Sequence, residues 1–119
     1  MTRAIVLFGH GSREAQWREP MDEVARRIRA RVPQVDVRCA FLDLEPPDLA
    51  TAVDQLIAAG ADSIRIVPMF LGVGKHARED LPRIVEQCRH AHPALHIELQ
   101  SSVGENTRLL DLLAAIALE

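Results

Sequence analysis

The stretch that decides the fold is Ala4-Ile5-Val6-Leu7-Phe8-Gly9-His10, in which a continuous apolar run ends at a glycine. An apolar run of this length is typical of a strand that is buried on both faces of a sheet. A second, mostly apolar run extends over residues 64–71. We therefore predict that these two segments form the central strands of one sheet.

Two other segments show the alternation that is typical of strands with one more polar side. Val35, Val37, Cys39 and Phe41 alternate with their neighbours in the segment 35–41, and the segment 95–99 alternates in the same way. Since continuous apolar runs suit the middle of a sheet, we expect the alternating strands at its edges. The predicted strand order is 2-1-3-4.

The segments between the strands have apolar residues at the spacing of one helical face. Strands that alternate with helices imply a parallel sheet with right-handed crossovers. The sequence therefore predicts a flavodoxin-like three-layer α/β fold with helices on both faces of a four-stranded sheet. The predicted helices are one whose apolar face runs from Trp17 to Val32 before Pro33, one from the N-cap Asp48 to Gly60, one with Pro82 in its first turn, and one over 106–118.

Length and composition limit the possible classes of protein. The 119 residues suit one hydrophobic core, so we expect a single domain over 1–119. A formal charge of -3 without a block of Lys and Arg argues against a nucleic-acid partner.

The apolar run after Met1, Thr2 and Arg3 is too short for a signal peptide or a membrane span, so we expect a cytoplasmic protein without a membrane partner. Cys39 and Cys88 form no CxxC pattern and are expected to be small core residues.

Two histidines follow the two predicted central strands, His10 after the first and His76 after the second. A crevice opens between the carboxyl ends of such strands, where the chain winds in opposite directions. Asp43 and Glu45, in the next loop, could bring carboxylates to the same place. Two imidazoles and a carboxylate suit Co, Fe, Ni or Zn. A lone loop histidine more often caps a backbone carbonyl, but the shared position of this pair favours a metal site.

The remaining polar residues receive a structural interpretation. His90 and His92 near a helix end and His96 on an edge strand are expected at the surface. The charges of the first helix, beginning with Arg18, look like a solvated face. The loop Gly9-His10-Gly11-Ser12 could hold a phosphate at a helix N-terminus, but it lacks the longer glycine patterns of nucleotide-binding loops. A phosphate-ligand α/β domain and a non-catalytic metal-binding or metal-delivery protein stay open as alternatives.

Five motifs spread over nearly the whole chain are Leu7-Phe8-Gly9-His10-Gly11-Ser12-Arg13, Ala40-Phe41-Leu42-Asp43, Val67-Pro68-Met69-Phe70-Leu71, Gly74-Lys75-His76 and Glu79-Asp80-Leu81-Pro82. Together they resemble the small sirohydrochlorin chelatases of the CbiX and SirB kind. The resemblance implies a lyase that inserts Co2+ or Fe2+, or Ni2+ in related members, into sirohydrochlorin on the way to cobalamin or sirohaem. It implies that His10 and His76 bind this metal, which is a substrate, so no permanent cofactor is expected.

The resemblance also bears on the other residues of the site. A carboxylate often follows Phe-Leu in this family and is usually a glutamate; here Asp43 has that position and Glu45 stands two residues later, so either could face the metal. Insertion releases pyrrole protons, and His10 is the first candidate to accept one. Three cations in the same loops could hold the carboxylates of the tetrapyrrole. They are Arg13, Lys75 and Arg78.

The predicted last helix bears on the oligomeric state. From Leu109 onward it is apolar almost all round, and only one side can rest on its own sheet. A partner is expected to cover the rest. Since longer relatives of the family hold two such units in one chain, the resemblance implies a homodimer.

Overall fold

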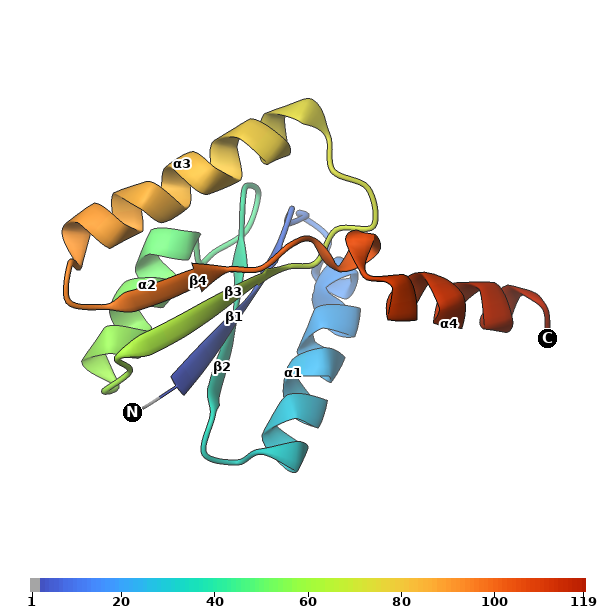
Figure 1. Ribbon diagram of the computed structural model, residues 1–119, viewed down its shortest axis with the longest axis horizontal. Helices are drawn as coiled ribbons and strands as arrows, with labels where there is room; N and C mark the ends of the chain where they lie inside the picture. Colours follow the sequence, from blue (N-terminus) through green and yellow to red (C-terminus); the bar gives the residue numbers. More distant parts are fainter. Residues whose placement is uncertain (1–2) are drawn as a thin grey trace.

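The computed structural model describes residues 3–119, so the prediction that concerned Met1 and Thr2 lies outside the described residues. Four parallel strands form one sheet of order β2-β1-β3-β4, which confirms the predicted order and fold class (Figure 1). The elements in chain order are β1 (Arg3–Gly9), η1 (Ala15–Arg18), α1 (Glu19–Arg31), β2 (Asp36–Phe41), α2 (Leu49–Ala58), β3 (Ser63–Pro68), α3 (Lys75–Ala91), β4 (His96–Leu99), η2 (Val103–Glu105) and α4 (Thr107–Ala117).

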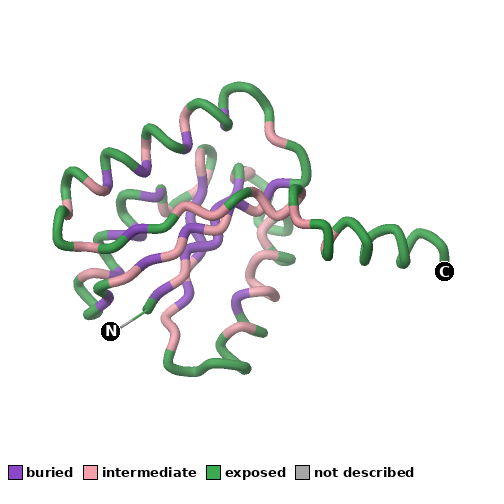
Figure 2. Tube along the Cα trace, in the orientation of Figure 1, coloured by how far each residue is buried: buried purple, intermediate pink, exposed green. Residues whose placement is uncertain are grey.

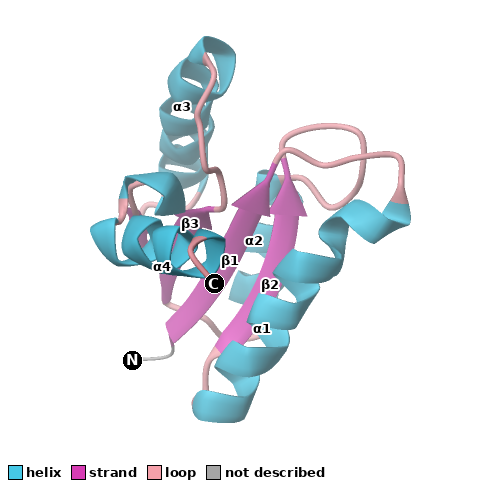
Figure 3. Cartoon of the chain, turned by 90° about the vertical axis from the view of Figure 1, so that its right-hand side faces the viewer, coloured by secondary structure: helices cyan, strands magenta, loops and turns pink. Residues whose placement is uncertain are grey.

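The central strand β1 separates two hydrophobic cores, and Figure 2 shows the buried positions gathered mainly on the strands in the middle of the molecule. Val6 and Phe8 point into the larger core, which α2 and α3 cover, whereas Leu7 points into the smaller core beneath α1. Neighbouring residues of one strand are buried on opposite faces, as a continuous apolar run requires. Figure 3 shows the resulting layers, with α1 on one side of the sheet and α2 and α3 on the other.

Both cysteines are buried and free, as predicted for core residues. Cys39 contributes to the core under α1 and Cys88 to the core under α3. Burial, which disfavours a thiolate, raises the pKa of both thiols. Neither side chain is therefore a reactive nucleophile in this fold.

The limits predicted for α2 are confirmed by hydrogen bonds at both ends. Asp48 accepts the backbone N–H of Thr51 at 2.9 Å and so caps the first turn. At the other end, Gly60 has a φ of 104°, and Ala61 donates to the carbonyl of Leu56 at 3.0 Å. This pattern is the glycine-dependent stop of a helix, in which a left-handed residue lets the chain turn back.

Two helices begin at places that differ from the prediction. Trp17 belongs to the short helix η1 rather than to α1, and its side chain is 72% exposed. The helix α3 begins at Lys75, so Pro82 lies in its interior instead of its first turn. Pro82 has no N–H for the carbonyl of Arg78, but its exposed ring crowds no neighbouring element. The sequence pattern placed the start of this helix near Leu81, where its apolar stripe begins, because the preceding turns of α3 are mostly polar.

The helix α4 differs most from the prediction. It projects from the body of the molecule and does not rest one side on the sheet (Figures 1 and 2). None of its residues is buried, and the element it contacts most is the adjoining η2. The expectation that the chain's own sheet covers one side of this helix is therefore wrong for the single chain. Among residues 3–119, no helix is long and apolar enough to cross a bilayer.

Candidate functional site

His10 is the first residue after β1, and its side chain is exposed. Its ring packs beside that of Phe70, which follows β3, with 4.5 Å between the ring centroids. Phe70 is buried, so it gives the imidazole a rigid neighbour. The sheet register places Phe8 beside Pro68, which explains why the residues after β1 and β3 meet here. The topology therefore presents one histidine at the carboxyl edge of the sheet.

Backbone hydrogen bonds fix the loop that carries His10. The carbonyl of Gly9 accepts the N–H of Leu42 at 2.9 Å, and the carbonyl of His10 accepts the N–H of Asp43 at 3.0 Å. The next residue, Gly11, has a φ of 91°, and a Cβ there would lie 1.9 Å from the carbonyl oxygen of Asp43. Only glycine fits this position, because any side chain would clash with backbone.

Glu45 holds the same loop from the other side. Its Oε2 accepts the backbone N–H of Ser12 at 2.7 Å, and its Oε1 lies 3.6 Å from Nη1 of Arg18. The side chain of Glu45 is only 13% exposed. A carboxylate with these two partners fixes the geometry of the loop.

Arg18 connects Glu45 to the first turn of α1. Its guanidinium bonds to Asp22 at 3.0 Å and lies over the ring of Phe41, 5.0 Å from the centroid. The hydrogen bond to Asp22 is the main cause that raises the pKa of Arg18. The interpretation of Arg18 as part of a solvated face is therefore wrong. Helical spacing predicts exposure from the helix alone. It could not take account of the loop after β2, whose Glu45 lies beside the Arg18 side chain.

These residues surround a cleft of about 370 Å³. Its lining is predominantly apolar, and His10, Arg18 and Glu45 are the ionisable side chains among the lining residues. Mostly apolar lining with a few polar groups is usual for sites that bind small organic ligands. The side chains that line the cleft are those of His10, Trp17, Arg18, Pro20, Met21, Val24, Phe41, Glu45, Met69 and Phe70.

The two candidate carboxylates occupy different positions. Glu45 lines the cleft with His10, whereas Asp43 is exposed and does not line it. Asp43 instead accepts the backbone N–H of Leu44 at 2.8 Å. Leu44 has a φ of 71°, so the chain turns between the two carboxylates. The sequence left this choice open, and the turn places Glu45 at the cleft.

His76 lies in the first turn of α3, one residue after Lys75, and not in a loop as predicted. Its side chain is exposed and does not line the cleft around His10. Within residues 3–119, no three side chains of His, Cys, Asp or Glu lie close enough together to hold a metal ion. The expected convergence of ligands from three strand ends is therefore not present in the single chain. What the fold does provide is two exposed histidines after the neighbouring strands β1 and β3.

The three predicted cations are all exposed near the carboxyl edge of the sheet. Arg13 follows the glycine loop, and Lys75 and Arg78 belong to the first turn of α3. The guanidinium of Arg78 donates to the carbonyl of Val73, at 3.5 Å. In the part of the chain that the structure describes, none of the three forms an ion pair, so their charges are free to meet an anionic ligand.

Most residues of the cleft were not predicted as site residues, among them Trp17, Arg18 and Phe70. Trp17 was assigned to a buried helix face, yet it is exposed and its Nε1 donates to Glu14 at 3.2 Å. It is the single tryptophan of a chain with few aromatic residues, which was a usable signal. Phe70 follows the apolar run of β3 and could not be distinguished from the core by composition.

A family model and a curated relative point to the same family of proteins. The family model described as CbiX matches residues 4–119. Over 82 residues the chain is 35% identical to a sirohydrochlorin cobaltochelatase of Methanococcus aeolicus, a match that covers 69% of this chain and 57% of the relative. The chain thus spans little more than half the length of this curated relative.

Two solved structures have the same fold. One is a Marinobacter aquaeolei CbiX protein named for cobalamin biosynthesis, with a TM-score of 0.83, 29% identity, and coverage of 97% of this chain and 93% of that chain. The other is the sirohydrochlorin chelatase SirB of Bacillus subtilis subspecies spizizenii in complex with cobalt, with a TM-score of 0.81, 24% identity, and coverage of 97% and 49%. The family match over residues 4–119 is decisive, and the chain belongs to the CbiX family.

Proposed function

We propose that the chain is a lyase that inserts a divalent metal ion, Co2+, Fe2+ or Ni2+, into sirohydrochlorin. The observation that carries the proposal is the exposed imidazole of His10 at the rim of a mostly apolar cleft, on a loop that backbone hydrogen bonds hold rigid. A flat macrocycle needs an apolar wall, and the arriving metal needs a nitrogen ligand. Family membership and the name of the Methanococcus aeolicus relative support the same reaction.

The proposed chemistry exchanges pyrrole protons for the metal ion. Two N–H protons leave the ring as metal–nitrogen bonds form: a nearby base accepts one after it has released the metal, and the other passes to solvent. His10 is the candidate base, because the Glu45 carboxylate is already bonded to Ser12 and close to Arg18. We propose that His10 and His76 hold the incoming metal and that Glu45 positions the His10 loop.

The substrate is polyanionic, and exposed cations of the chain can bind its carboxylates. The exposed cations Arg13, Lys75 and Arg78 surround the carboxyl edge of the sheet without ion-pair partners among residues 3–119. Carboxylates of the tetrapyrrole can bond to these groups while its ring covers the apolar wall. Trp17, which is exposed beside this wall, is suited to pack against the ring.

We also propose that the working unit is a homodimer. The exposed fractions of Leu112, Leu113 and Ile116 in α4 are 56%, 38% and 53%. Burying a large apolar side chain contributes about 1.5–3 kcal/mol, so these residues favour association. The coverage of 49% of the SirB chain by almost all of this chain supports a two-unit assembly. A cytoplasmic location and the lack of a permanent cofactor stay predictions.

The phosphate alternative is disfavoured by one contact. The backbone N–H of Ser12, which a phosphate in the glycine loop would need, already donates to the carboxylate of Glu45. A carboxylate in this place also repels an anion. Gly11 therefore serves the close approach of the Asp43 carbonyl, and not the binding of a phosphate.

Catalysis can be separated from simple metal binding by two measurements on the wild-type protein. We expect Co2+ to bind, and we expect the protein to accelerate the spectral change that accompanies insertion into sirohydrochlorin over many turnovers. Stoichiometric binding of Co2+ with an unchanged rate of insertion would support the metal-delivery alternative and contradict the proposal. Repeating the assay with Fe2+ and Ni2+ would define the preferred metal, since affinity alone does not.

A further inference from the structure

Phe70, whose ring packs beside His10, is held in place from three directions. The N–H of Met69 donates to the carbonyl of Phe8 at 2.8 Å, which ties the residue after β3 to β1. The carbonyl of Phe70 itself accepts the N–H of Gly104 in η2 at 2.9 Å. Its ring is 4% exposed and lies edge to face with the ring of Phe8, with 6.2 Å between the centroids. Edge-to-face packing is a preferred geometry of aromatic pairs, so both the backbone and the ring of Phe70 are fixed.

Gly104 can approach Phe70 because it has no side chain. A Cβ at this position would lie 1.9 Å from the carbonyl oxygen of Leu71 and 2.7 Å from its Cα. These are backbone atoms, which cannot rotate away as the end of a flexible side chain can. A larger residue at this position therefore moves η2 away from the β3–α3 loop, residues 69–74, and lengthens the hydrogen bond to Phe70.

The imidazole of His10 takes its orientation from the ring of Phe70. Metal-binding histidines usually donate their second ring N–H to a carboxylate or a carbonyl, and this bond fixes the ring. Over residues 3–119, the one histidine ring with a hydrogen bond is that of His92, whose Nε2 lies 2.8 Å from Oδ1 of Asp54. His10 has no such bond there. Its ring instead packs against that of Phe70, at 4.5 Å between centroids and 47° between planes.

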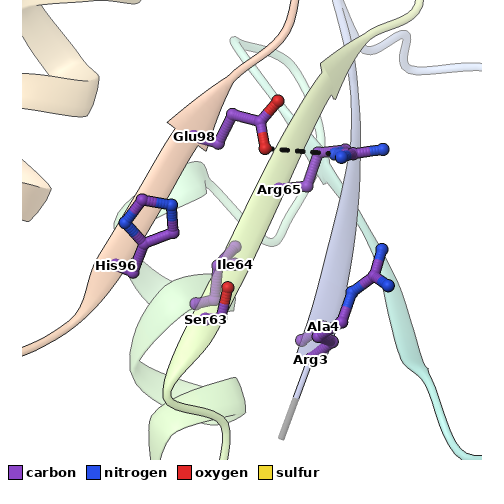
Figure 4. A pocket seen from close by; sticks show the side chains of 7 residues that line it. All are labelled: Arg3, Ala4, Ser63, Ile64, Arg65, His96 and Glu98. Atoms are coloured by element: carbon purple, nitrogen blue, oxygen red, sulfur yellow. Dashed lines mark hydrogen bonds and ion pairs between the residues drawn. The ribbon is translucent and has the colours of Figure 1, made fainter. Parts of the chain in front are cut away.

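The histidine at the other end of the sheet has no comparable support. His96 of β4 lines the hollow at the amino ends of the strands, where Arg65 and Glu98 form an ion pair at 3.4 Å (Figure 4). None of the residues that line this hollow is aromatic. His96 is therefore an internal reference, because a change that acts through the ring of Phe70 reaches His10 and not His96.

From these observations we propose that Phe70 and Gly104 are positioning residues for His10. The ring of Phe70, held by Gly104, has the orienting role that a hydrogen-bond partner has at other metal-binding histidines. The inference rests on the proposed function, in which His10 binds the incoming metal ion. It adds to that function a residue, Gly104, that does not line the cleft.

An aromatic neighbour suits a metal ion that is a substrate. A carboxylate partner orients a histidine and also raises its basicity, so it strengthens the bond to the metal. A contact with an aromatic ring orients the imidazole without adding a negative charge. The histidine then holds the metal in a fixed direction and still releases it to the nitrogens of the macrocycle.

Gly104→Ala tests the proposal from outside the cleft. It keeps the ring of Phe70 but weakens its backbone anchor, so the imidazole should lose its fixed place beside the ring. In NMR spectra without metal, we expect the Cε1–H resonance of His10 to move, since it senses the ring current of Phe70, and that of His96 to stay. We expect the dissociation constant for Co2+ to rise by about tenfold, as when a histidine ligand loses its orienting partner. Gly72→Ala, in the same loop with open space around it, is the matched control and should change neither.

A second pair of variants removes the ring itself. Phe70→Leu keeps an apolar side chain in the core, and we expect the dissociation constant for Co2+ to rise by about tenfold here too. Ile64→Val, in the same core near the other end of β3, also loses packing and should bind Co2+ as the wild type does. This pair decides the question if Gly104→Ala does not fold.

Binding of sirohydrochlorin separates positioning of His10 from a general distortion of the cleft. Trp17 is the single tryptophan of the chain and lines the cleft, so quenching of its fluorescence reports binding of the tetrapyrrole without insertion. Gly104→Ala leaves the apolar lining in place, so we expect its dissociation constant for sirohydrochlorin to change by less than about twofold.

Each outcome decides the proposal. Unchanged Co2+ affinity in Gly104→Ala and Phe70→Leu would overturn it, and so would an unmoved His10 resonance in Gly104→Ala. Equal losses of affinity for Co2+ and for sirohydrochlorin would indicate a distorted cleft and would also overturn it. If Co2+ affinity falls as expected but the wild type inserts no metal, the positioning role stands and the proposed reaction is wrong.

Discussion

The two ends of the sheet differ in a way that size alone does not reveal. The hollow at the amino ends of the strands has about 490 Å³, whereas the cleft at the carboxyl ends has about 370 Å³. Each contains an exposed histidine, His96 in the first and His10 in the second. Only the carboxyl end has a histidine loop fixed by backbone hydrogen bonds and by the carboxylate of Glu45. Rigid placement of polar groups, and not volume, therefore distinguishes the end at which we propose the reaction.

The largest effect that this comparison predicts follows from removing the imidazole at the carboxyl end. We expect His10→Ala to lower the rate of metal insertion by about 10²-fold or more, since the ligand and the proton acceptor are lost together. The free energy of unfolding should change by less than about 0.5 kcal/mol, because the side chain is exposed. His90→Ala, at an exposed position near the end of α3, is the matched control. Equal rates for the two variants would remove His10 from the site.

The second prediction concerns the backbone beneath His10. Gly11→Ala places a methyl group 1.9 Å from the carbonyl oxygen of Asp43 at a φ of 91°, so we expect the free energy of unfolding to fall by about 1–3 kcal/mol. Gly72→Ala has open space around it and should change the free energy by less than about 0.5 kcal/mol. Urea unfolding of both variants measures the difference. A stable Gly11→Ala protein would show that the loop is not rigid.

The third prediction separates the two carboxylates. Glu45→Gln weakens the bond to the Ser12 N–H and removes the charge that faces Arg18, so the His10 loop loosens and insertion should slow by roughly tenfold. Asp43→Asn keeps an oxygen for the Leu44 N–H outside the cleft and should change the rate by less than about twofold. Initial rates at saturating metal measure both. The reverse order would place Asp43, and not Glu45, at the reacting atoms.

The smallest effect is expected at the amino end of the sheet. Glu98→Gln removes an ion pair with Arg65, whose atoms are 3.4 Å apart and whose side chains are about half exposed. Exposed pairs contribute little, so the free energy of unfolding should change by less than about 1 kcal/mol at a fixed protein concentration. Urea unfolding at low and high salt checks this. A larger, salt-dependent change would mean that this end is electrostatically organised as tightly as the other.

The sequence predicted the fold well for a simple reason. The run in β1 is apolar and largely buried on both faces, as expected of a central strand, whereas β3 is buried on one face and half-exposed on the other, where Ser63 and Arg65 lie. Capping residues such as Asp48 and Gly60 act locally, so they too can be recognised without a structure. The position of His10 at the carboxyl edge follows from the strand order.

The remaining features depend on contacts that no local pattern contains. The choice between Asp43 and Glu45 depends on the left-handed turn at Leu44, a residue type that seldom adopts it. The role of Arg18 depends on the loop after β2, which is distant in sequence. The periodicity of α4 shows that one side must be covered, but it does not say by which chain.

The central claim is that His10 and His76 act together on one metal ion, although only His10 lines the cleft. The most direct test measures Co2+ insertion into sirohydrochlorin by His10→Ala, His76→Ala and the double variant, beside the wild type. Residues that act as one unit are strongly non-additive, so we predict that the double variant is about as slow as either single variant. Wild-type rates in His76→Ala, or losses that multiply in the double variant, would contradict the two-histidine account.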